Sequence, residues 1–361
     1  MRHRPNRPFP PRLASWPGGC ALFVAAVLFG AGLLEIVLRT FGHQPLQVHA
    51  ERTNFWAYHP TFGWHHRPDQ QGYVQLGDER IAVRFNGRGL RDRDYPDERV
   101  ADKNRILVLG DSFAWGYGVA QEETFSERLE ATLPDVEVIN AGVSGYSTDQ
   151  ELRWLEAEGL RYQPDLVILT MAGNDDTLNR RSIAYFVYPK PFFLLGTDGA
   201  LELRNVPVPR ASLSRRVAYQ VSRRSALLKL AVDRSAQLAR RARRPTRPGI
   251  EAAASGAPKP AEPFALTVAL VERIRRAAAG GGARLLLVTT PMYSSPDAPG
   301  TYAEFLITLR ARGLQVLDVE ALEGFSPEAM RLPNDGHWNS TGHAFVAARL
   351  TEMITEQALL D

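Results

Sequence analysis

Cysteine is almost absent from this sequence of 361 residues, which contains only Cys20. A single cysteine excludes an intramolecular disulfide, so the folded part must depend on its hydrophobic core, which a chain of this length can build. The formal net charge is only +3, which is too small to indicate nucleic acid as a partner. Metal-ligand spacing is also lacking: His65 and His66 have no clustered Cys, Asp or Glu partners. We therefore expect a surface loop at this pair and no metal site.

The sequence contains a single long apolar run, at residues 20–38. Glu35 is the one charged residue within it. Its length suits a membrane-spanning helix, which needs about 20 apolar residues. Four arginines precede it and favour a cytoplasmic N-terminus: Arg2, Arg4, Arg7 and Arg12. A cleaved signal peptide is the alternative, but no small-x-small cleavage site follows. The sequence predicts a single-pass anchor in a bacterial inner membrane, with the rest of the chain in the periplasm, and Glu35 and Arg39 are spaced to pair.

Beyond the apolar run, short apolar stretches alternate with segments of helical periodicity. This βαβα order predicts a parallel sheet covered by helices on both faces. The expected strands are residues 106–109, 136–139, 165–171, 285–288 and 315–318. The expected helices include 264–279 and 302–311, and the Ser/Thr-x-x-Glu strings Thr124 to Glu127 and Thr148 to Glu151 predict two capped helix starts.

Four short blocks of polar and glycine residues occur in order along the chain, and three of them directly follow a predicted strand. The blocks are Gly110-Asp111-Ser112, residues 140–145 (NAGVSG), Gly173-Asn174-Asp175 and residues 335–339 (DGHWN). Ligands of an open α/β sheet bind beyond the carboxyl ends of its strands. We therefore expect the blocks to share one rim of the sheet.

With these four blocks the chain resembles the SGNH, or GDSL-type, hydrolase superfamily. The residues that give that family its name correspond here to Ser112, Gly145, Asn174 and His337. The resemblance covers about residues 105–350 and implies an α/β protein with a flavodoxin-like three-layer α/β/α sandwich around a central parallel sheet, preceded by one transmembrane helix. It also implies ester chemistry.

The chemistry of these residue types agrees with that expectation. Ser112 needs a base to accept its proton, and His337 is the candidate because histidine titrates near neutral pH. Asp335 would orient the imidazole ring and stabilise its charged form. The backbone amides of Ser112 and Gly145 and the side-chain amide of Asn174 would form the oxyanion hole. A serine mechanism needs no cofactor.

One departure concerns the acid. Most relatives place the aspartate three residues before the histidine, where this chain has Asn334, whereas Asp335 lies two before it. The Asp-x-His-Trp form resembles the alginate O-acetyltransferase relatives. Three functions follow, in this order: a serine esterase acting on acetyl or other acyl esters, an O-acyltransferase modifying an exported polysaccharide or envelope glycan, and a non-catalytic carbohydrate-binding module. The expected partners are an ester-bearing substrate such as an acylated glycan, and the membrane.

The rest of the chain divides by composition. We expect a cytoplasmic tail (1–18), a transmembrane anchor (19–41), a small β-rich adaptor (42–103) and the hydrolase domain (104–361) with an insertion at 177–262. The insertion contains an aromatic segment, 185–195, that could cap the active site, an arginine-rich amphipathic helical stretch, 212–244, and a loop rich in Pro, Ala and Gly, 245–263. Within the hydrolase domain, His343 follows the catalytic loop in a helical pattern and is expected to be structural.

Overall fold

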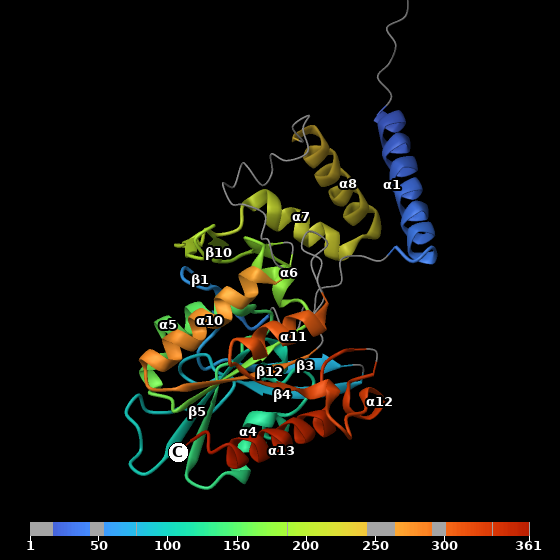
Figure 1. Ribbon diagram of the computed structural model, residues 1–361. Coiled ribbons are helices and arrows are strands. Elements are labelled where there is room, and N and C mark those ends of the chain that lie inside the picture. Colours follow the sequence, from blue (N-terminus) through green and yellow to red (C-terminus); the bar gives the residue numbers. More distant parts are fainter. Residues whose placement is uncertain are drawn as a thin grey trace, which may run out of the picture. The chain divides into compact units, whose positions relative to one another are not determined.

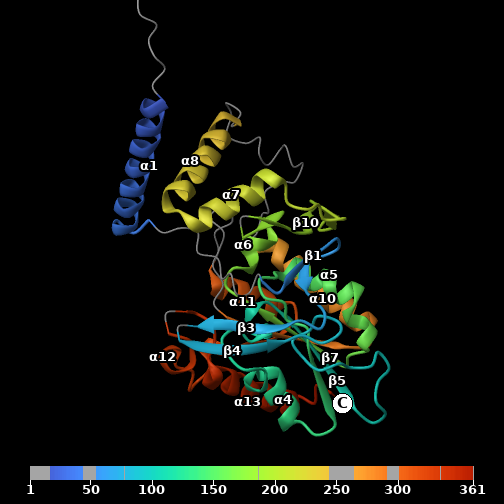
Figure 2. The ribbon, with the colours of Figure 1, turned by 180° about the vertical axis from the view of Figure 1, so that it is seen from behind.

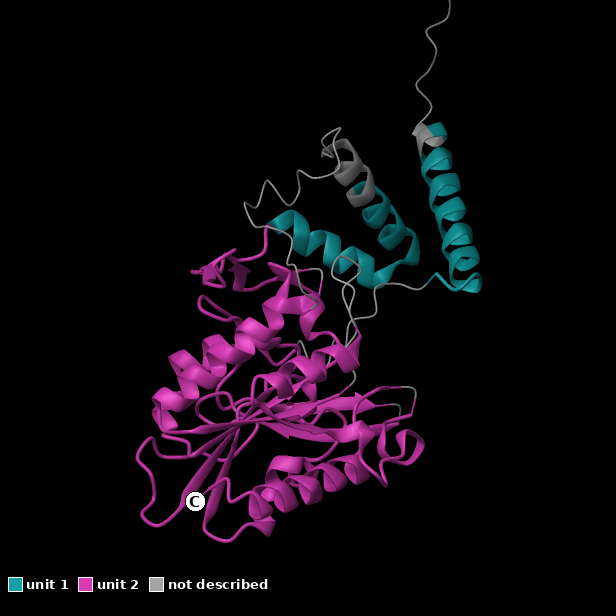
Figure 3. Ribbon diagram, viewed as in Figure 1, with its two compact units in different colours: residues 1–48, 213–244 teal, residues 49–212, 245–361 magenta. Residues whose placement is uncertain are grey.

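The computed structural model describes residues 17–43, 54–76, 78–185, 187–243, 264–290, 301–333 and 335–360. The loop predicted at 245–263 and the tail before residue 17 lie outside these residues. The chain forms two compact units (Figure 3). Unit 1 contains residues 1–48 and 213–244, and unit 2 contains residues 49–212 and 245–361.

The centre of unit 2 is a five-stranded parallel sheet, in agreement with the fold expected from the sequence. The strands are β5 (Asn104–Gly110), β6 (Val136–Asn140), β7 (Leu166–Met171), β12 (Arg284–Thr289) and β13 (Gln315–Asp318). Their order across the sheet is β13-β12-β7-β5-β6. All pairs are parallel, so the loops after β7, β5 and β6 leave the same edge side by side.

Helices cover both faces of this sheet (Figures 1 and 2). Alternate residues of a strand point to opposite faces: Leu107 and Leu109 of β5 belong to one apolar cluster, and Ile106 and Val108 belong to the other. The first cluster is completed by α5 (Thr148–Ala157), α10 (Ala265–Gly280) and α11 (Tyr302–Ala311), and the second by α4 (Phe125–Thr132) and α13 (Ser340–Glu356). The result is a three-layer α/β/α arrangement.

Two antiparallel hairpins precede the sheet in unit 2. The first joins β1 (Trp56–His59) to β2 (Gly63–His66), and the second joins β3 (Gln71–Leu76) to β4 (Glu79–Arg84). Val74 and Val83 of the second hairpin pack with Trp115 and Tyr117. The hairpins therefore support the chain that follows the end of β5.

The described part of the insertion contributes to both units. In unit 2 the chain after β7 forms one short helix and two antiparallel strand pairs. The helix is α6 (Asp175–Asn179), and the pairs are β8 (Ile183–Ala184) with β9 (Tyr188–Pro189) and β10 (Phe192–Leu195) with β11 (Leu201–Arg204). The smaller elements near the sheet ends are α3 (Ser112–Trp115), η1 (Gln121–Glu123), η2 (Gly159–Tyr162), η3 (Val319–Ala321) and α12 (Pro327–Met330).

The described residues of unit 1 form three helices: α1 (Pro17–Thr40), α7 (Leu213–Arg224) and α8 (Ala226–Arg243). The amphipathic stretch predicted as one helical region is thus two helices that meet at Ser225. In α1, residues 21–40 are long and apolar enough to cross a membrane or to be a signal sequence. The expected pair forms, because Arg39 Nε donates to Glu35 Oε1 at 2.7 Å.

Candidate active site

Ser112 stands where β5 turns sharply into the short helix α3. The turn requires glycine at position 110, because a Cβ atom there would lie 2.7 Å from Ala114 Cβ and 2.9 Å from Thr170 Cβ. Asp111 caps the helix start by accepting a hydrogen bond from the Phe113 amide at 2.9 Å. The turn places Ser112 just beyond the carboxyl end of β5, at the edge of the sheet where ligands of open α/β sheets bind.

The far end of α3 is held by Arg91, which the sequence analysis missed. This guanidinium is fully buried and donates to the carbonyl oxygens of Trp115 at 3.0 Å, Gly116 at 2.6 Å and Val119 at 2.7 Å. Burial lowers the pKa of Arg91 to about 10. Arg91 remains charged at neutral pH and fixes the segment that carries Ser112.

His337 lies in a loop tied back on itself just before α13. Arg331 and Trp338 form an isolated β-bridge, and the Leu332 amide donates to the His337 carbonyl at 2.8 Å. The indole of Trp338 is fully buried in the core beneath the loop. These contacts fix the backbone of His337 from both sides.

The structure brings three of the predicted site residues together. Ser112 Oγ lies 2.6 Å from His337 Nε2, and His337 Nδ1 contacts Asp335 Oδ1. The same Asp335 oxygen accepts a hydrogen bond from the His337 backbone amide at 2.9 Å. The two-residue spacing therefore forms an Asx-type turn in which one carboxylate contacts both the backbone and the ring of His337. Asn334 lies outside the described residues.

Two aromatic rings flank the imidazole of His337. The ring centroids of Phe113 and Tyr117 each lie 4.8 Å from that of the imidazole. Both residues lie within five positions after Ser112. The segment that carries the serine therefore also positions the imidazole ring of His337. The sequence analysis did not name Phe113 and Tyr117 as site residues, although their closeness to Ser112 in the sequence could have indicated them.

Gly145 and Asn174 follow β6 and β7, the two neighbours of β5 in the sheet. Gly145 has a φ of +84°, and a Cβ atom there would lie 2.9 Å from the rings of Trp56 and Tyr185. Within the described part of the chain, nothing accepts a hydrogen bond from the Gly145 amide or from the exposed Asn174 side chain. These donors remain available to an oxygen of a ligand.

Asn140 joins the second block to the first. Its Nδ2 donates to the Ala114 carbonyl at 2.9 Å and to Ser126 Oγ at 3.0 Å, while its Oδ1 accepts from the Gly142 amide at 3.0 Å. The loop that carries Gly145 is therefore bonded to the helix that begins at Ser112.

The expectation of a surface loop at His65 and His66 is wrong. Both lie in β2, where His66 is buried and His65 is half-buried, and their rings bond to the backbone carbonyls of Gly89 at 3.1 Å and Arg88 at 3.2 Å, respectively. Burial lowers the pKa of His65 to about 4 and that of His66 well below its usual value. The β1–β2 strand pairing across the Pro60-Thr61-Phe62 turn was the missed signal.

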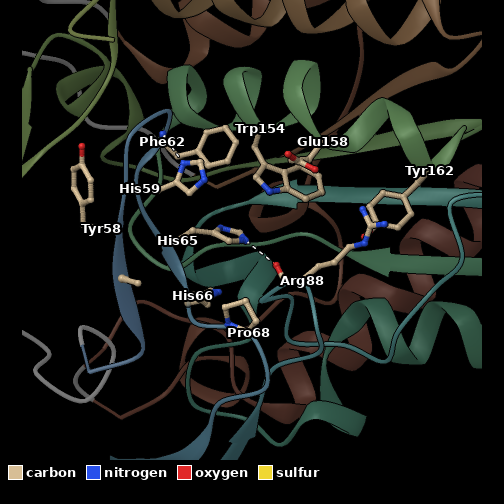
Figure 4. A pocket seen from close by; sticks show the side chains of 11 residues that line it. Tyr58, His59, Phe62, His65, His66, Pro68, Arg88, Trp154, Glu158 and Tyr162 are labelled. Carbon is tan, nitrogen blue, oxygen red and sulfur yellow. Dashed lines mark hydrogen bonds between the residues drawn. The ribbon is translucent and has the colours of Figure 1, made fainter. Parts of the chain in front are cut away.

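A cavity of about 310 Å³ opens beside these histidines (Figure 4). It is lined by His59, Phe62, His65, Trp154, Glu158 and Tyr162, among others, and includes neither Ser112 nor His337. The cavity is therefore separate from the candidate active site. Across the described ranges, no three His, Cys, Asp or Glu side chains are grouped to hold a metal ion.

His343 has a structural position, as expected. It is fully buried in α13, and its Nδ1 accepts a hydrogen bond from the Phe125 amide at 3.1 Å at the start of α4. Burial lowers the pKa of His343 to about 3, so the ring is neutral.

The described residues of the aromatic segment 185–195 divide between the core of unit 2 and the surroundings of Gly145. Phe193 is buried in the core of unit 2, where the guanidinium of Arg273 lies 5.4 Å from its ring centroid. Tyr185, which is only partly buried, lies against Gly145 together with Trp56 of β1. Trp56 belongs to the segment expected to be an adaptor and was not foreseen near the site.

The chain belongs to the GDSL-like lipase/acylhydrolase family, whose family model matches residues 108–345, more than half of its length. A stretch of 75 residues is 36% identical to an arylesterase of Vibrio mimicus and covers 20% of this chain and 38% of that protein. A stretch of 78 residues is 32% identical to thioesterase 1/protease 1/lysophospholipase L1 of Escherichia coli K12 and covers 21% and 38%, respectively. The chain thus spans well under half the length of these curated relatives.

Solved structures of esterases are similar at low sequence identity. A two-domain esterase active on acetylated mannans, crystallised with mannopentaose, aligns over 70% of this chain and 49% of its own, with 16% identity and a TM-score of 0.37. A psychrotrophic esterase from Pseudoalteromonas sp., inhibited by monoethylphosphonate, aligns over 71% and 99%, with 16% identity and a TM-score of 0.38.

Proposed function

We propose that this chain is a serine esterase that hydrolyses acyl esters with Ser112 as nucleophile, His337 as base and Asp335 as the residue that orients the base. The observation that carries this proposal is the contact of 2.6 Å between Ser112 Oγ and His337 Nε2, with Asp335 on the other ring nitrogen. Membership of the GDSL-like family supports it.

In the first half of the reaction, Ser112 Oγ attacks the ester carbonyl carbon while its proton passes to His337 Nε2. Negative charge then develops on the carbonyl oxygen. The amides of Ser112 and Gly145 and the side chain of Asn174 would stabilise this charge, each donor lowering the barrier by about 3 kcal/mol. The tetrahedral intermediate collapses when the C–O bond to the alcohol breaks and His337 Nε2 returns the proton to the leaving oxygen.

In the second half, water attacks the acyl-Ser112 ester and gives its proton to His337 Nε2. Collapse of the second intermediate breaks the acyl C–O bond to Ser112, releases the carboxylic acid and restores the serine hydroxyl. Asp335 accepts from His337 Nδ1 throughout, which favours the tautomer with a free Nε2 lone pair.

A second candidate is O-acyl transfer, in which a sugar hydroxyl replaces water in the second half. The Asp-x-His-Trp block favours it, because this block resembles that of the alginate O-acetyltransferase relatives and its Asp335 contacts the His337 ring. The acceptor would be an exported polysaccharide or cell-envelope glycan.

The test uses the purified full chain with p-nitrophenyl acetate, with and without saccharide acceptors, and measures acetate and acetylated sugar separately. A serine-reactive phosphonate should label Ser112, and Ser112→Ala should abolish both labelling and turnover without changing the melting curve. Saccharide binding without turnover would instead indicate a non-catalytic module and overturn the proposal.

We further propose that α1 is retained as a single-pass anchor in a bacterial inner membrane, with unit 2 in the periplasm. The apolar residues 21–40 and the arginines before them support this topology. A reporter active only in the periplasm and fused after Asp361 should be functional, and the chain should stay in the membrane fraction after an alkaline wash.

A further inference from the structure

Glu35, the single acidic residue of α1, contacts the start of α8, about 190 residues later in the sequence. Its Oε2 accepts from Ser225 Oγ at 2.7 Å and from the Leu227 amide at 2.9 Å. Its Oε1 accepts from the Ala226 amide at 2.8 Å and from Arg39 Nε at 2.7 Å. Both carboxylate oxygens are thus fully used within unit 1.

This contact provides hydrogen-bond partners both for the first amides of α8 and for the carboxylate of Glu35. The first amides of a helix have no partner within that helix and attract negative charge, and a carboxylate in apolar surroundings is costly unless it is hydrogen-bonded. Ser225 completes the arrangement, because its Oγ also accepts from the Leu228 amide at 3.0 Å. Arg39 adds a bond from Nη2 to the Arg224 carbonyl at 3.3 Å. We call the contact of Glu35, Arg39 and residues 224–227 the α1–α8 clamp.

The partly covered residues of α1 lie on the same helix face as the clamp residue Glu35. Ala31, Glu35 and Leu38 are partly covered, and they recur at intervals of four and three residues, which places them on one helix face. The remaining apolar side chains between Leu22 and Val37 are exposed, among them Phe29 at 75% and Ile36 at 63%. A helix of this kind offers one face to α8 and the other faces to lipid.

The two helices joined to the clamp each expose a mixed apolar and basic face. On α7 the exposed residues Leu213, Val217, Gln220 and Arg224 recur every three or four positions, whereas Tyr219 and Ser222 on the opposite side are buried. On α8 the exposed residues Leu228, Ala231 and Arg234 recur in the same way. Apolar residues accompanied by arginine are typical of helices that lie in a membrane interface.

We propose that the α1–α8 clamp fastens the helix pair α7–α8 to the outer end of α1, and that the exposed face of this pair lies on anionic lipid headgroups. This inference rests on the membrane anchoring proposed above. Two observations select lipid as the occupant. The face continues from the end of an apolar helix that itself fits a bilayer, and its arginines complement the charge of anionic headgroups. The clamp also favours a retained α1, because cleavage would remove the partner of the α8 amides.

The experiment uses the full chain in a Cys20→Ser background, so that one introduced cysteine carries a fluorophore. The probe site is Val217→Cys on α7, and the matched site is Ile307→Cys, also exposed, in α11 of unit 2. The protein is reconstituted into vesicles of phosphatidylcholine with phosphatidylglycerol or of phosphatidylcholine alone, and quenching by nitroxide lipids and by aqueous iodide is compared. We expect strong lipid quenching at position 217, none above background at 307, and a loss of the signal at 217 without phosphatidylglycerol.

Glu35→Gln tests the clamp. It should reduce lipid quenching at 217 to the level at 307, whereas Ile36→Ala, on the exposed side of the same turn, should leave it unchanged. Both variants should hydrolyse p-nitrophenyl acetate at the wild-type rate and resist alkaline extraction, which shows that they are folded and inserted. Ser225→Ala, which removes one bond of the clamp, should give an intermediate loss.

Four outcomes would overturn the inference. Iodide quenching at 217 in the inserted chain places the face in water, and protection from both quenchers means that a protein or a second copy covers it. Release of the chain at reduced mass by alkaline wash removes the anchor, and with it both this inference and the proposed topology. Wild-type quenching in Glu35→Gln would show that the clamp does not hold the helices in place.

Discussion

The ammonium group of Lys190 donates a hydrogen bond to the carboxylate of Asp149, and neither side chain has any exposed surface. Lys190 comes from the insertion, between β9 and β10, and Asp149 from the first turn of α5 behind the candidate active site. Glu151 and Asp175 lie in the same buried region. Burial, reinforced by neighbouring carboxylates, raises the pKa of both well above the usual range. Burial also raises the pKa of Asp149 and lowers that of Lys190, and the contact between these two groups opposes both shifts.

Lys190→Met should therefore destabilise unit 2 strongly. Removal of one partner leaves an uncompensated buried charge, which costs about 3–5 kcal/mol of the free energy of unfolding. Denaturant unfolding monitored by circular dichroism measures this loss. Arg204→Met, which breaks the exposed pair with Glu202 in the same insertion, is the control and should change nothing measurable. The double variant Lys190→Met/Asp149→Leu should recover most of the stability, and if it does not, the charge of Asp149 is not the cause.

Asp335→Asn should lower kcat by about 10⁴-fold, as loss of the orienting carboxylate does in serine triads. The Asn side chain can still accept the bond from the His337 amide, so the loop should fold while the ring loses its proper tautomer. Turnover of p-nitrophenyl acetate and the melting temperature are measured together. Asn334→Ala is the matched control with a lesser effect, and a larger effect at 334 than at 335 would mean that the acid is assigned wrongly.

Asn174→Ala should lower kcat by about 10²- to 10³-fold with little change in KM, because an oxyanion donor acts mainly in the transition state. Its side chain is exposed and has no bond to the described residues, so the melting temperature should not change. Asn205→Ala, in the insertion, removes a bond to the Lys190 carbonyl at 2.7 Å and serves as a control for general loosening of the loops. An equal loss of turnover in both variants would contradict the oxyanion role.

His343 should make the fold sensitive to acid. Burial lowers the pKa of His343 to about 3 in the folded chain, against about 6.5 when unfolded. The unfolded chain therefore binds more protons between these values, so stability is complete above about pH 6.5 and falls as the pH decreases, by about 2 kcal/mol at about pH 5. His343→Asn, which keeps an acceptor for the Phe125 amide, should flatten this dependence of the melting temperature on pH. His43→Asn, at an exposed position, should not, and an unchanged slope in His343→Asn would refute the assignment.

Much of the sheet was predictable because buried parallel strands are short continuous apolar runs. Each of the five predicted strands overlaps β5, β6, β7, β12 or β13, and the helices at 265–280 and 302–311 match within a residue or two. Helix starts were less certain. Thr124 does cap α4, but Ser147, and not Thr148, is the N-cap of α5, and the carboxylate of Glu151 is buried without a hydrogen bond. Burial of α5 against the sheet decided that position, and local sequence does not encode it.

The residues of the candidate site likewise include some that the sequence could indicate and some that it could not. The four blocks could be found from sequence because each one follows a strand or precedes a helix. Arg91, Trp56 and the α1–α8 clamp could not, because each acts over a long sequence separation through contacts that only the folded chain creates. The spacing of Glu35 and Arg39 indicated their pair, but nothing in the sequence indicated the contacts of Glu35 with residues 225–227.

Tyr185 and Phe193 should differ in their effect on specificity, although both belong to the same aromatic segment. Tyr185 is partly buried against Gly145, beside the candidate oxyanion hole, so its ring can contact the acyl or sugar part of a substrate. Tyr185→Ala should raise KM for a bulky saccharide ester far more than for p-nitrophenyl acetate, with a small change in melting temperature. Phe193 is 1% exposed in the core, and Phe193→Ala should cost about 3–5 kcal/mol of stability while affecting both substrates equally. Equal losses on both substrates in Tyr185→Ala would assign that ring a structural role as well.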